Sequence, residues 1–460
     1  MSRTYRKSSP ARSGALTVLE EVLTHGKTLL DGLPLLDPAC SDPRDLALAR
    51  EIVSGTCRWL GRVQYVLRHY AARLDQFPPI VQRILELSVY QLLFLDRVPP
   101  YAVLSDAVEL ARERKVPGLA AAVNAILRKV VQEKESHGRV DSTGLDPERF
   151  LEAEYSHPAW LVKRWREIWP EEMVDSLCRF NNTRAPLSLR AREDVEAALS
   201  ELRRRNLPAE LDSRVPGCMM IDFPGSAPAG LFDLDLWVAQ DGAAMLIAPL
   251  VDPQPGWRIW DVCAAPGGKT LHLAGLAGNQ AEIVATDVNP SRVDRLRDQV
   301  KKNGNRGITV LELDALRQNP PREGGRFDAI LVDAPCSGWG TFRRHPDLRW
   351  RLQPGDMVRF GTQAARLLER VQRRLKPGGV LVYSTCTLSP EENEDVVTGF
   401  LRSHPEFTLE PVDAWLPPAM AKAMNPGGCL EVFPPVWNLD GAYAARLRKK
   451  RDIMERGPRR

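Results

Sequence analysis

Hydrophobic residues recur at helical spacing throughout the first part of the chain. Apolar positions three and four apart mark five stretches, residues 15–26, 46–74, 79–95, 101–115 and 118–134. A helix with one apolar stripe is stable only when neighbouring helices cover that stripe. The pattern therefore predicts an all-α helical bundle over residues 1–138.

The pattern loses its period after this bundle and then becomes mixed. Residues 139–157 are mostly polar and include glycine, which is typical of a linker. Beyond them, residues 157–169 and 193–207 have helical spacing, whereas "PLSLRA" and "CMMIDF" are typical of short strands. We expect a linker and a small α+β domain over residues 139–237.

A third pattern begins near residue 238, where β-type apolar runs alternate with amphipathic helices. The predicted strands are "WRIWDVC", "AEIVATD", "ITVLELD", "FDAILVDAP" and "GVLVYSTC". Helices are predicted between them at 269–278, 289–303 and 355–379. This alternation predicts a Rossmann-like α/β domain over residues 238–450, with a doubly wound parallel sheet. In such sheets, ligands bind beyond the carboxyl ends of the strands.

The composition indicates which kind of protein this is and where it is located. The hydrophobic content of 43% supports real cores, and no run approaches the ~18 apolar residues of a membrane span. The first residues, "MSRTYRKSSPARSG", lack the apolar segment of a signal peptide. We expect a cytoplasmic protein with no membrane partner.

The chain has eight cysteines, and no two are closer than Cys40 and Cys57. A C-x-x-C knuckle is therefore missing, and we expect no metal site. The net charge of +4 does not by itself imply a nucleic-acid partner, but basic residues cluster in "FRRHPDLRWRLQP" and "RLRKKRDIMERGPRR". The second cluster is equally compatible with solvated surface charge.

The first predicted strand runs into "DVCAAPGGKT", residues 261–270. Its proline and glycines predict a tight turn that lets a ligand approach the backbone at the start of the next helix. Asp287 closes the second strand at the spacing expected of a ribose-binding acid, and Asp314 closes the third. Either aspartate alone would suit a helix cap or turn, but three such strand ends in succession favour a nucleoside-containing cofactor.

S-adenosylmethionine is the cofactor that remains after two others are excluded. A P-loop needs glycine where this chain has Cys263, and "CAAPGG" does not supply G-x-G-x-x-G. Lys269 stands at a helix start, where the helix dipole disfavours a cation. Its charge requires an acidic partner, either the cofactor's carboxylate or Asp333; a solvated lysine is the alternative.

Two cysteines follow predicted strands at the same edge of the sheet, Cys336 in "VDAPCSGWG" and Cys386 in "YSTCTLSPEENEDV". A thiolate that adds to carbon 6 of cytosine makes carbon 5 nucleophilic enough to accept a methyl group. Such a site must favour the thiolate, because a free thiol is mostly protonated at neutral pH. Asp333 is a candidate to protonate or hydrogen-bond N3 of the base. Either cysteine alone would suit buried packing.

Long motifs carry a family resemblance. "DVCAAPGGKT", "DAPCSGWGTFRRHPDLRW" and "YSTCTLSPEENE" resemble the signature segments of the RNA (cytosine-5)-methyltransferases. The helical region, with "RVPPYAVLSDAVELA" and "VNAILRKV", resembles the RNA-binding antitermination factor NusB. Together they resemble the bacterial 16S rRNA methyltransferases of the RsmB/Sun type over nearly the whole chain, including "PPVWNLDGAYAARLRK". "AYAARL" departs from the pair of aromatic residues that relatives more often carry there.

The resemblance implies methyl transfer from S-adenosylmethionine to carbon 5 of a cytosine in small-subunit rRNA. It implies that Cys386 is the nucleophile, that Cys336 helps to release the product, and that RNA is the partner. We expect the enzyme to be a monomer. The residues implied to line the cofactor site are Cys263, Ala264, Ala265, Pro266, Gly267, Gly268, Lys269, Asp287, Asp314 and Asp333.

Three rival classes make different demands on these residues. A DNA cytosine-5 methyltransferase would use Cys336 of the proline-cysteine motif as its nucleophile, with Cys386 as packing. Amino-group methyltransferases usually carry an aromatic residue after the proline, and "DAPC" has none. An RNA-binding ribosome assembly factor with a vestigial catalytic domain would need none of the intact motifs.

Overall fold

The computed structural model describes residues 7–134, 140–141, 143, 145–222, 230–232, 236–320 and 325–451. The chain forms two compact units, one of residues 1–184 with 342–354 and one of residues 185–341 with 355–460. Residues 452–460 of the basic C-terminal segment, and residues 135–139 around the start of the expected linker, lie outside the described residues.

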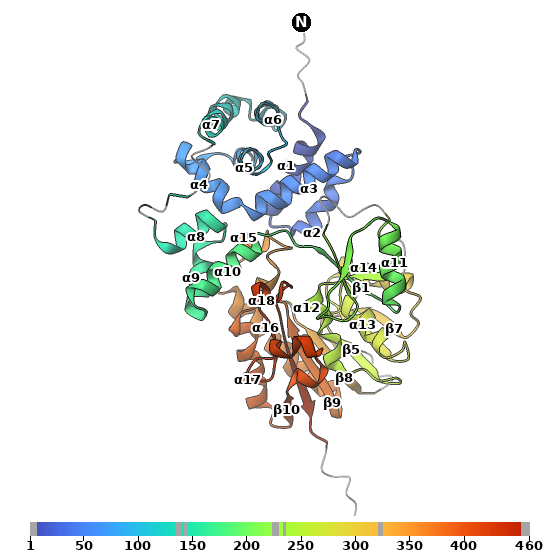
Figure 1. Ribbon diagram of the computed structural model, residues 1–460. Helices are drawn as coiled ribbons and strands as arrows, with labels where there is room; N and C mark the ends of the chain where they lie inside the picture. Colours follow the sequence, from blue (N-terminus) through green and yellow to red (C-terminus); the bar gives the residue numbers. More distant parts are fainter. Residues whose placement is uncertain are drawn as a thin grey trace, which may run out of the picture. The chain divides into compact units, whose positions relative to one another are not determined.

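The first unit begins with the expected bundle of helices, in which α5 lies in the middle (Figure 1). Proline in the first turn follows a capping side chain at Ser9 and Asp42, as is typical of helix starts. The helix α5 is buried on nearly every side, as its continuous apolar sequence requires. The helices are α1 (Pro10–Leu23), α2 (Leu29–Gly32), α3 (Pro43–Arg58), α4 (Leu60–Tyr70), α5 (Pro79–Phe94), α6 (Pro100–Glu113) and α7 (Ala120–Gln132).

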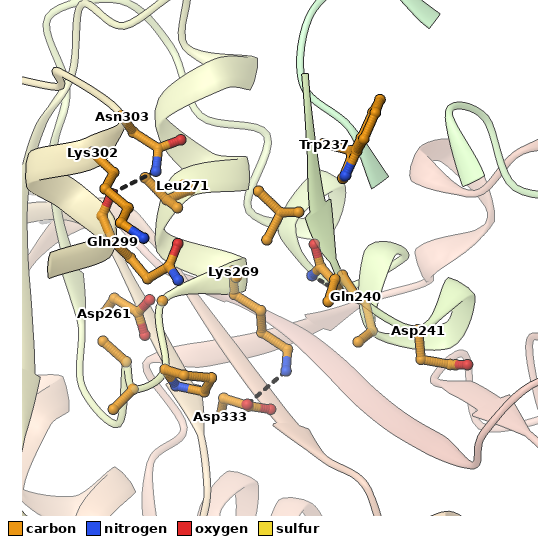
Figure 2. A pocket seen from close by; sticks show the side chains of 18 of the residues that line it. Trp237, Gln240, Asp241, Asp261, Lys269, Leu271, Gln299, Lys302, Asn303 and Asp333 are labelled. Carbon is orange, nitrogen blue, oxygen red and sulfur yellow. Dashed lines mark hydrogen bonds and ion pairs between the residues drawn. The ribbon is translucent and has the colours of Figure 1, made fainter. Parts of the chain in front are cut away.

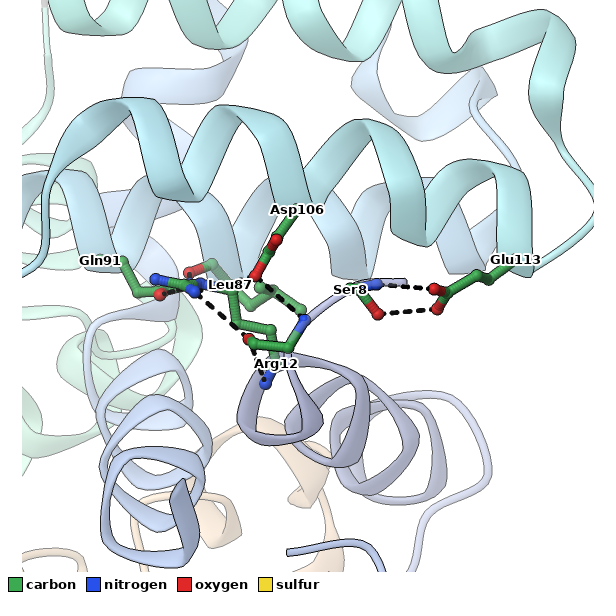
Figure 3. Close-up of polar contacts among 7 residues, drawn as sticks. Ser8, Arg12, Leu87, Gln91, Asp106 and Glu113 are labelled. Carbon is green, nitrogen blue, oxygen red and sulfur yellow. Dashed lines mark hydrogen bonds and ion pairs between the residues drawn. The ribbon is translucent and has the colours of Figure 1, made fainter. Parts of the chain in front are cut away.

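A charged pair is buried inside this bundle (Figure 3). The Arg12 guanidinium lies 2.9 Å from a carboxylate oxygen of Asp106 and donates to the Gln91 side chain at 2.8 Å. Gln91 in turn donates to the Leu87 carbonyl at 2.9 Å. Nearby, the Ser8 hydroxyl donates to Glu113 at 2.7 Å. The start of α1 is thus tied to α5 and α6.

The segment expected to be a linker contains a helix, α8 (Pro147–Tyr155). Asp146 caps it by accepting from the backbone N–H of Arg149 at 2.8 Å, and proline occupies the first turn. With only nine residues, the helix is too short to show a clear apolar period in a polar sequence. Two more helices follow, α9 (Ala159–Ile168) and α10 (Glu171–Asn181).

Residues 342–354, with α15 (Leu348–Arg351), also belong to this first unit, although the sequence places them between strands of the predicted catalytic domain. The Trp350 indole donates to the Cys57 carbonyl at 2.7 Å, and Asp347 accepts from Leu29 N at 3.1 Å. Arg349 is fully buried and donates to backbone carbonyls, and burial lowers the pKa of Arg349 to about 9. This arginine of the predicted basic cluster is packed inside the unit rather than displayed to RNA.

The second unit contains a small antiparallel sheet in the order β2-β3-β1-β4, with α11 (Val195–Arg204) packed on it. The two strands predicted from "PLSLRA" and "CMMIDF" are present as β1 and β3, and two more strands flank them. The strands are β1 (Leu187–Ala191), β2 (Ala209–Leu211), β3 (Cys218–Ile221) and β4 (Trp237–Ala239).

The larger sheet of this unit has the order β10-β12-β9-β8-β5-β6-β7. Its five predicted strands pair in parallel, which confirms the Rossmann-like α/β prediction. An antiparallel edge is added by β12, which pairs with β9, β10 and β11. The strands are β5 (Arg258–Asp261), β6 (Glu282–Asp287), β7 (Ile308–Glu312), β8 (Phe327–Asp333), β9 (Leu375–Thr385), β10 (Phe407–Glu410), β11 (Leu430–Val432) and β12 (Ala442–Lys449).

Alternate residues of each strand pack on opposite faces of this sheet. On β8, Ala329 and Leu331 join the core with α13 (Gly268–Leu276) and α14 (Pro290–Lys302). Ile330 and Val332 join the other core with α16 (Asp356–Val371) and α17 (Glu394–Ser403). Two short helices, α12 (Gly242–Met245) and α18 (Pro434–Trp437), complete the unit. Within the described ranges, no helix is long and apolar enough to cross a bilayer.

Candidate active site

The loop between β5 and α13 forms a tight turn around two glycines. Gly267 has a φ of +110°, and a Cβ there would lie 2.6 Å from a side-chain carbon of Leu296, so the turn needs glycine. Gly268 begins α13, and the backbone N–H of Ala264 donates to the Thr286 carbonyl of β6 at 2.8 Å. The loop is thereby held at the carboxyl ends of β5 and β6.

A cavity of about 800 Å³ opens beside this loop (Figure 2). Gln299 and Lys302 of α14 line one part of it together with Asn303, the residue after the helix, and the small sheet contributes Trp237. The predicted cofactor residues that line it are Cys263, Ala264, Ala265, Pro266, Gly267, Gly268, Lys269 and Asp333. A volume of this size accommodates a nucleoside-containing ligand.

Asp261, the last residue of β5, also lines the cavity and was not among the predicted site residues. One carboxylate oxygen accepts from the Thr270 hydroxyl at 2.6 Å, while Oδ1 is buried with no hydrogen-bond partner in the described chain. Burial raises the pKa of Asp261 to about 7. The unpartnered oxygen suits a cationic donor such as the ammonium of S-adenosylmethionine, so the cavity fits this cofactor. Its position in the sequence could have indicated this role, because Asp261 is an acidic residue at the end of the first predicted strand, as Asp287 and Asp314 are at the ends of the next two.

Lys269 forms an ion pair with Asp333. Asp333 was one of the two acidic partners that the sequence suggested for this lysine. Its ammonium lies 2.6 Å from a carboxylate oxygen of Asp333, and the Ser384 hydroxyl donates to the other oxygen at 2.8 Å. Burial opposes the charge of Lys269, but the attraction of Asp333 outweighs it and raises the pKa of Lys269. Figure 2 shows this pair beside Asp261.

The two remaining predicted cofactor residues, Asp287 and Asp314, are not among the described residues that line the cavity. Oδ1 of Asp287 accepts from Asn289 N at 2.9 Å, and Oδ1 of Asp314 accepts from Leu316 N at 3.0 Å. Asp314 also lies 3.3 Å from the guanidinium of Arg317. These contacts are those of turn-forming carboxylates, so binding of the ribose by Asp287 and a place for Asp314 in the cofactor site stay predictions.

The two cysteines lie side by side, although they are fifty positions apart in the sequence. Their sulfur atoms are 3.2 Å apart, and the backbone N–H of Cys386 points at the Cys336 sulfur at 3.4 Å. Cys386 is exposed and Cys336 is half-buried. The hydrogen bond with Cys386, followed by burial, raises the pKa of Cys336 well above the usual thiol value.

Backbone contacts hold the two cysteine segments together. Ala334 N donates to the Ser384 carbonyl at 2.8 Å, and Gly340 N donates to the Cys386 carbonyl at 3.1 Å. Gly441 N donates to the Gly340 carbonyl at 2.8 Å, and a Cβ on Gly340 would lie 2.5 Å from the Gly441 Cα. The stretch "AYAARL" is part of β12, where Tyr443 is buried opposite Thr385 of β9. Among the described residues, no cluster of ligands for a metal ion is found.

The sequence matches three family models in succession along the chain. Residues 9–132 match the NusB family, and residues 157–227 match the ferredoxin-like domain of RsmF/B-like methyltransferases. Residues 248–448 match the model described as 16S rRNA methyltransferase RsmB/F.

Full-length relatives and a solved structure agree with these matches. The chain is 34% identical to "Probable ribosomal RNA small subunit methyltransferase B" of Synechocystis, covering 88% of this chain and 92% of the relative. It is 31% identical to the protein of the same name in Bacillus subtilis, with 95% and 97% coverage. It resembles the crystal structure of PH0851 with a TM-score of 0.80 and 27% identity, covering 95% of this chain and 99% of that one. The chain therefore belongs to the RsmB family of S-adenosylmethionine-dependent methyltransferases that act on small-subunit ribosomal RNA.

Proposed function

We propose that this enzyme methylates carbon 5 of a cytosine in 16S rRNA through a covalent bond between Cys386 and carbon 6 of the base. The observation that carries the proposal is the contact of two thiols, 3.2 Å apart, at the strand ends next to the cavity. One thiol is exposed and the other half-buried, so the two are not equivalent. An enzyme that methylates a base nitrogen has no use for such a pair, because the nitrogen itself takes the methyl group without a thiol nucleophile.

The cavity residues would hold S-adenosylmethionine, which supplies an electrophilic methyl group when bound. Asp261 would accept from its ammonium, and the turn at Gly267 and Gly268 would let it approach the backbone. Asp287 is proposed to bind its ribose hydroxyls and Asp314 to lie near its base. Lys269 and Asp333 form the edge of the cavity that faces the cysteine segments.

Cys386 would attack as a thiolate, forming the bond to carbon 6 and moving the electron pair of the C5–C6 double bond onto carbon 5. Lys269 lies near enough to Cys386 for their charges to interact. The Lys269 and Asp333 pair can hydrogen-bond the base as negative charge develops on its ring. Carbon 5 then takes the methyl group.

Product release requires loss of the proton from carbon 5, re-formation of the double bond and departure of the Cys386 thiolate. Cys336 is the group in contact with Cys386 at this point, and we assign it to this elimination. The helices of the first unit are proposed to bind the rRNA, with the enzyme acting as a monomer.

Single substitutions of the two cysteines test the proposal. Cys386→Ala should abolish methyl transfer and form no RNA adduct, because the nucleophile is missing. Cys336→Ala should attack and methylate, then remain attached to RNA through Cys386. Denaturing gels of each full-length variant with a small-subunit rRNA transcript and S-adenosylmethionine would show a slow-migrating adduct only for Cys336→Ala.

Other outcomes would reassign the thiols. An adduct from Cys386→Ala would make Cys336 the nucleophile, as in DNA cytosine-5 methyltransferases. Two active variants without adducts would return both thiols to a packing role. Cys429→Ala is a matched control, because Cys429 is a buried thiol next to Tyr443 that has no part in the proposed chemistry.

A further inference from the structure

A buried carboxylate lies close to the two cysteine segments. Within the described chain it does not line the cavity and forms no hydrogen bond with either thiol. Glu392 ends the short 3-10 helix Pro390–Glu392 and is 1% exposed. Its two oxygens accept from Ser337, one from the backbone N–H at 2.7 Å and one from the hydroxyl at 2.5 Å. Both contacts are directed at the residue that follows Cys336.

The same hydroxyl connects the second cysteine segment. The Ser337 and Thr387 hydroxyls are 2.7 Å apart and hydrogen bonded, and Thr387 is the residue that follows Cys386. Glu392 therefore reaches the residue after each cysteine, directly on one side and through Ser337 on the other. A clamp of this kind fixes the backbone on which each thiol is carried.

The position of Glu392 is itself determined by close packing. The Tyr383 hydroxyl donates to the Glu392 carbonyl, and Asn393 bonds both Thr385 and the Thr387 carbonyl, at 2.7 and 3.1 Å. Helix α16 approaches closely, since a Cβ on Gly361 would lie 2.2 Å from the Glu391 carbonyl oxygen. The backbone that carries Glu392 therefore cannot move away without disturbing β9 or α16.

We propose that Glu392 is a positioning residue that holds Cys336 against Cys386 and, through its negative charge, keeps Cys336 as the protonated thiol of the pair. Cys386 is then the thiol that attacks carbon 6. In the elimination, Cys336 gives its proton to the departing Cys386 sulfur, 3.2 Å away, and takes up the proton that carbon 5 loses, so both cysteines end the step as thiols. This inference rests on the proposed function and adds the group that assigns the two thiols their different roles.

Electrostatics supports this division of roles. Several effects raise the pKa of Cys336. The largest is the hydrogen bond to Cys386, followed by burial, the charge of Cys386 and the charge of Glu392. Burial raises the pKa of Glu392 to about 7, against the effect of its bonds from Ser337, and the neighbouring Glu391 adds to that rise. Glu392 therefore carries its full negative charge only above about pH 7, and its effect on Cys336 is expected in that range. Burial, followed by the charges of Cys336 and Glu392, raises the pKa of Tyr383.

Two substitutions separate the charge of Glu392 from its hydrogen bonds. Glu392→Gln removes the charge, yet its oxygen can accept from Ser337 N while its amide donates to the Ser337 hydroxyl. Glu392→Ala removes both charge and clamp. Glu391→Gln is the matched control, because it removes one charge from the same turn at a side chain that does not bond Ser337.

The first test measures thiol reactivity and needs no RNA. The full-length protein and its variants are treated with limiting iodoacetamide at a pH above the pKa of Glu392, about 7, and mass spectrometry compares labelling at Cys336 and Cys386. For Glu392→Gln we expect labelling of Cys336 to rise about three- to tenfold relative to Cys386, because each unit of lowered thiol pKa gives about ten times more thiolate. Glu391→Gln should leave the ratio as in the unmodified enzyme, and an unchanged ratio in Glu392→Gln would refute the electrostatic role.

The second test measures the covalent adduct on rRNA. Glu392→Ala should retain RNA as Cys336→Ala does, with at least about a tenfold loss of turnover and unchanged affinity for S-adenosylmethionine, and Glu392→Gln should recover part of that turnover. Loss of activity without an adduct, equal in both variants, would contradict positioning. If Cys336→Ala itself forms no adduct, the proposed function fails. The ratio of iodoacetamide labelling at Cys336 and Cys386 still tests the electrostatic role of Glu392 in that case.

Discussion

Both units bury ionised groups, but they treat them differently. In the helical bundle, Arg12 meets the Asp106 carboxylate at 2.9 Å and the Gln91 amide oxygen at 2.8 Å, so its charge is neutralised within the fold. In the catalytic unit, the Asp261 carboxyl has only the Thr270 hydroxyl, and one oxygen has no partner in the described chain. The buried charge of the bundle has a counter-charge within the fold, whereas the buried carboxyl of the catalytic unit lines a cavity and has an oxygen without a partner in the described chain.

This difference separates charges that stabilise a fold from charges that bind a ligand. A buried charge without a counter-charge raises the free energy of the folded protein unless a ligand supplies the missing partner. The raised pKa of Asp261, about 7, is the signature of that missing partner. Substitution should therefore destabilise the bundle at Arg12 but weaken ligand binding at Asp261.

The largest effect is expected from Arg12→Met, which leaves Asp106 buried without its cation. Breaking such a pair lowers local stability by about 3–5 kcal/mol. Hydrogen exchange of the α1 and α5 amides in the full-length protein should speed up accordingly, with unchanged affinity for S-adenosylmethionine. The control Arg204→Ala breaks an exposed pair with Glu201 and should change neither. Unchanged exchange in Arg12→Met would show that the buried pair does not stabilise the bundle.

Asp261→Asn should have the opposite profile. Loss of the charged acceptor should weaken S-adenosylmethionine binding by about 1–3 kcal/mol, measured by calorimetry. Stability should not fall, because the variant no longer buries an ionisable group. If calorimetry finds the same dissociation constant, Asp261 does not contact the cofactor.

The pH dependence of the same residue sharpens the comparison. A carboxyl whose pKa is raised from 3.8 to about 7 stabilises the fold at low pH, and that contribution is lost as the pH rises through about 7. Binding of a cationic ammonium requires the ionised form, so affinity for S-adenosylmethionine should rise over the same range. Asp261→Asn should flatten both curves, and identical pH profiles would assign them to another group.

Asp287→Ala tests a carboxylate at the neighbouring strand end. If it holds the ribose hydroxyls, binding of S-adenosylmethionine should weaken by ~1 to 3 kcal/mol. If it only forms the turn to Asn289, thermal stability should drop while the dissociation constant stays the same. Calorimetry and thermal unfolding of the same sample distinguish the two.

The smallest effect is expected for RNA binding by the bundle. Arg128 and Lys129 are exposed on α7, and replacing both with alanine should weaken rRNA binding and lower its salt dependence by about one unit of slope for each phosphate that is no longer bound. Arg204→Ala again serves as control. Equal salt slopes would remove α7 from the RNA surface. Point variants are preferable to deleting residues 1–138, because residues 342–354 bond that region at Cys57 and Leu29.

Local patterns in the sequence were enough to predict the helical bundle, the five parallel strands, the glycine turn at Gly267 and the placement of both cysteines at strand ends. Each depends on residues within a few positions of one another, where apolar period and turn chemistry act directly. The prediction of a charged partner for Lys269 followed from the dipole of a single helix.

Tertiary structure alone decided which of these groups meet. Asp333 lies sixty-four positions from Lys269, and Glu392 lies fifty-five from Ser337. It also decided that Arg349 is buried in the first unit, and that β12 forms an antiparallel pair with β9. Burial and pairing between distant segments determine whether a charged group finds a counter-charge within the fold, as Arg12 does, or lacks one, as Asp261 does. Periodicity along the chain does not contain that information, because it records which face of an element is apolar but not what packs against it.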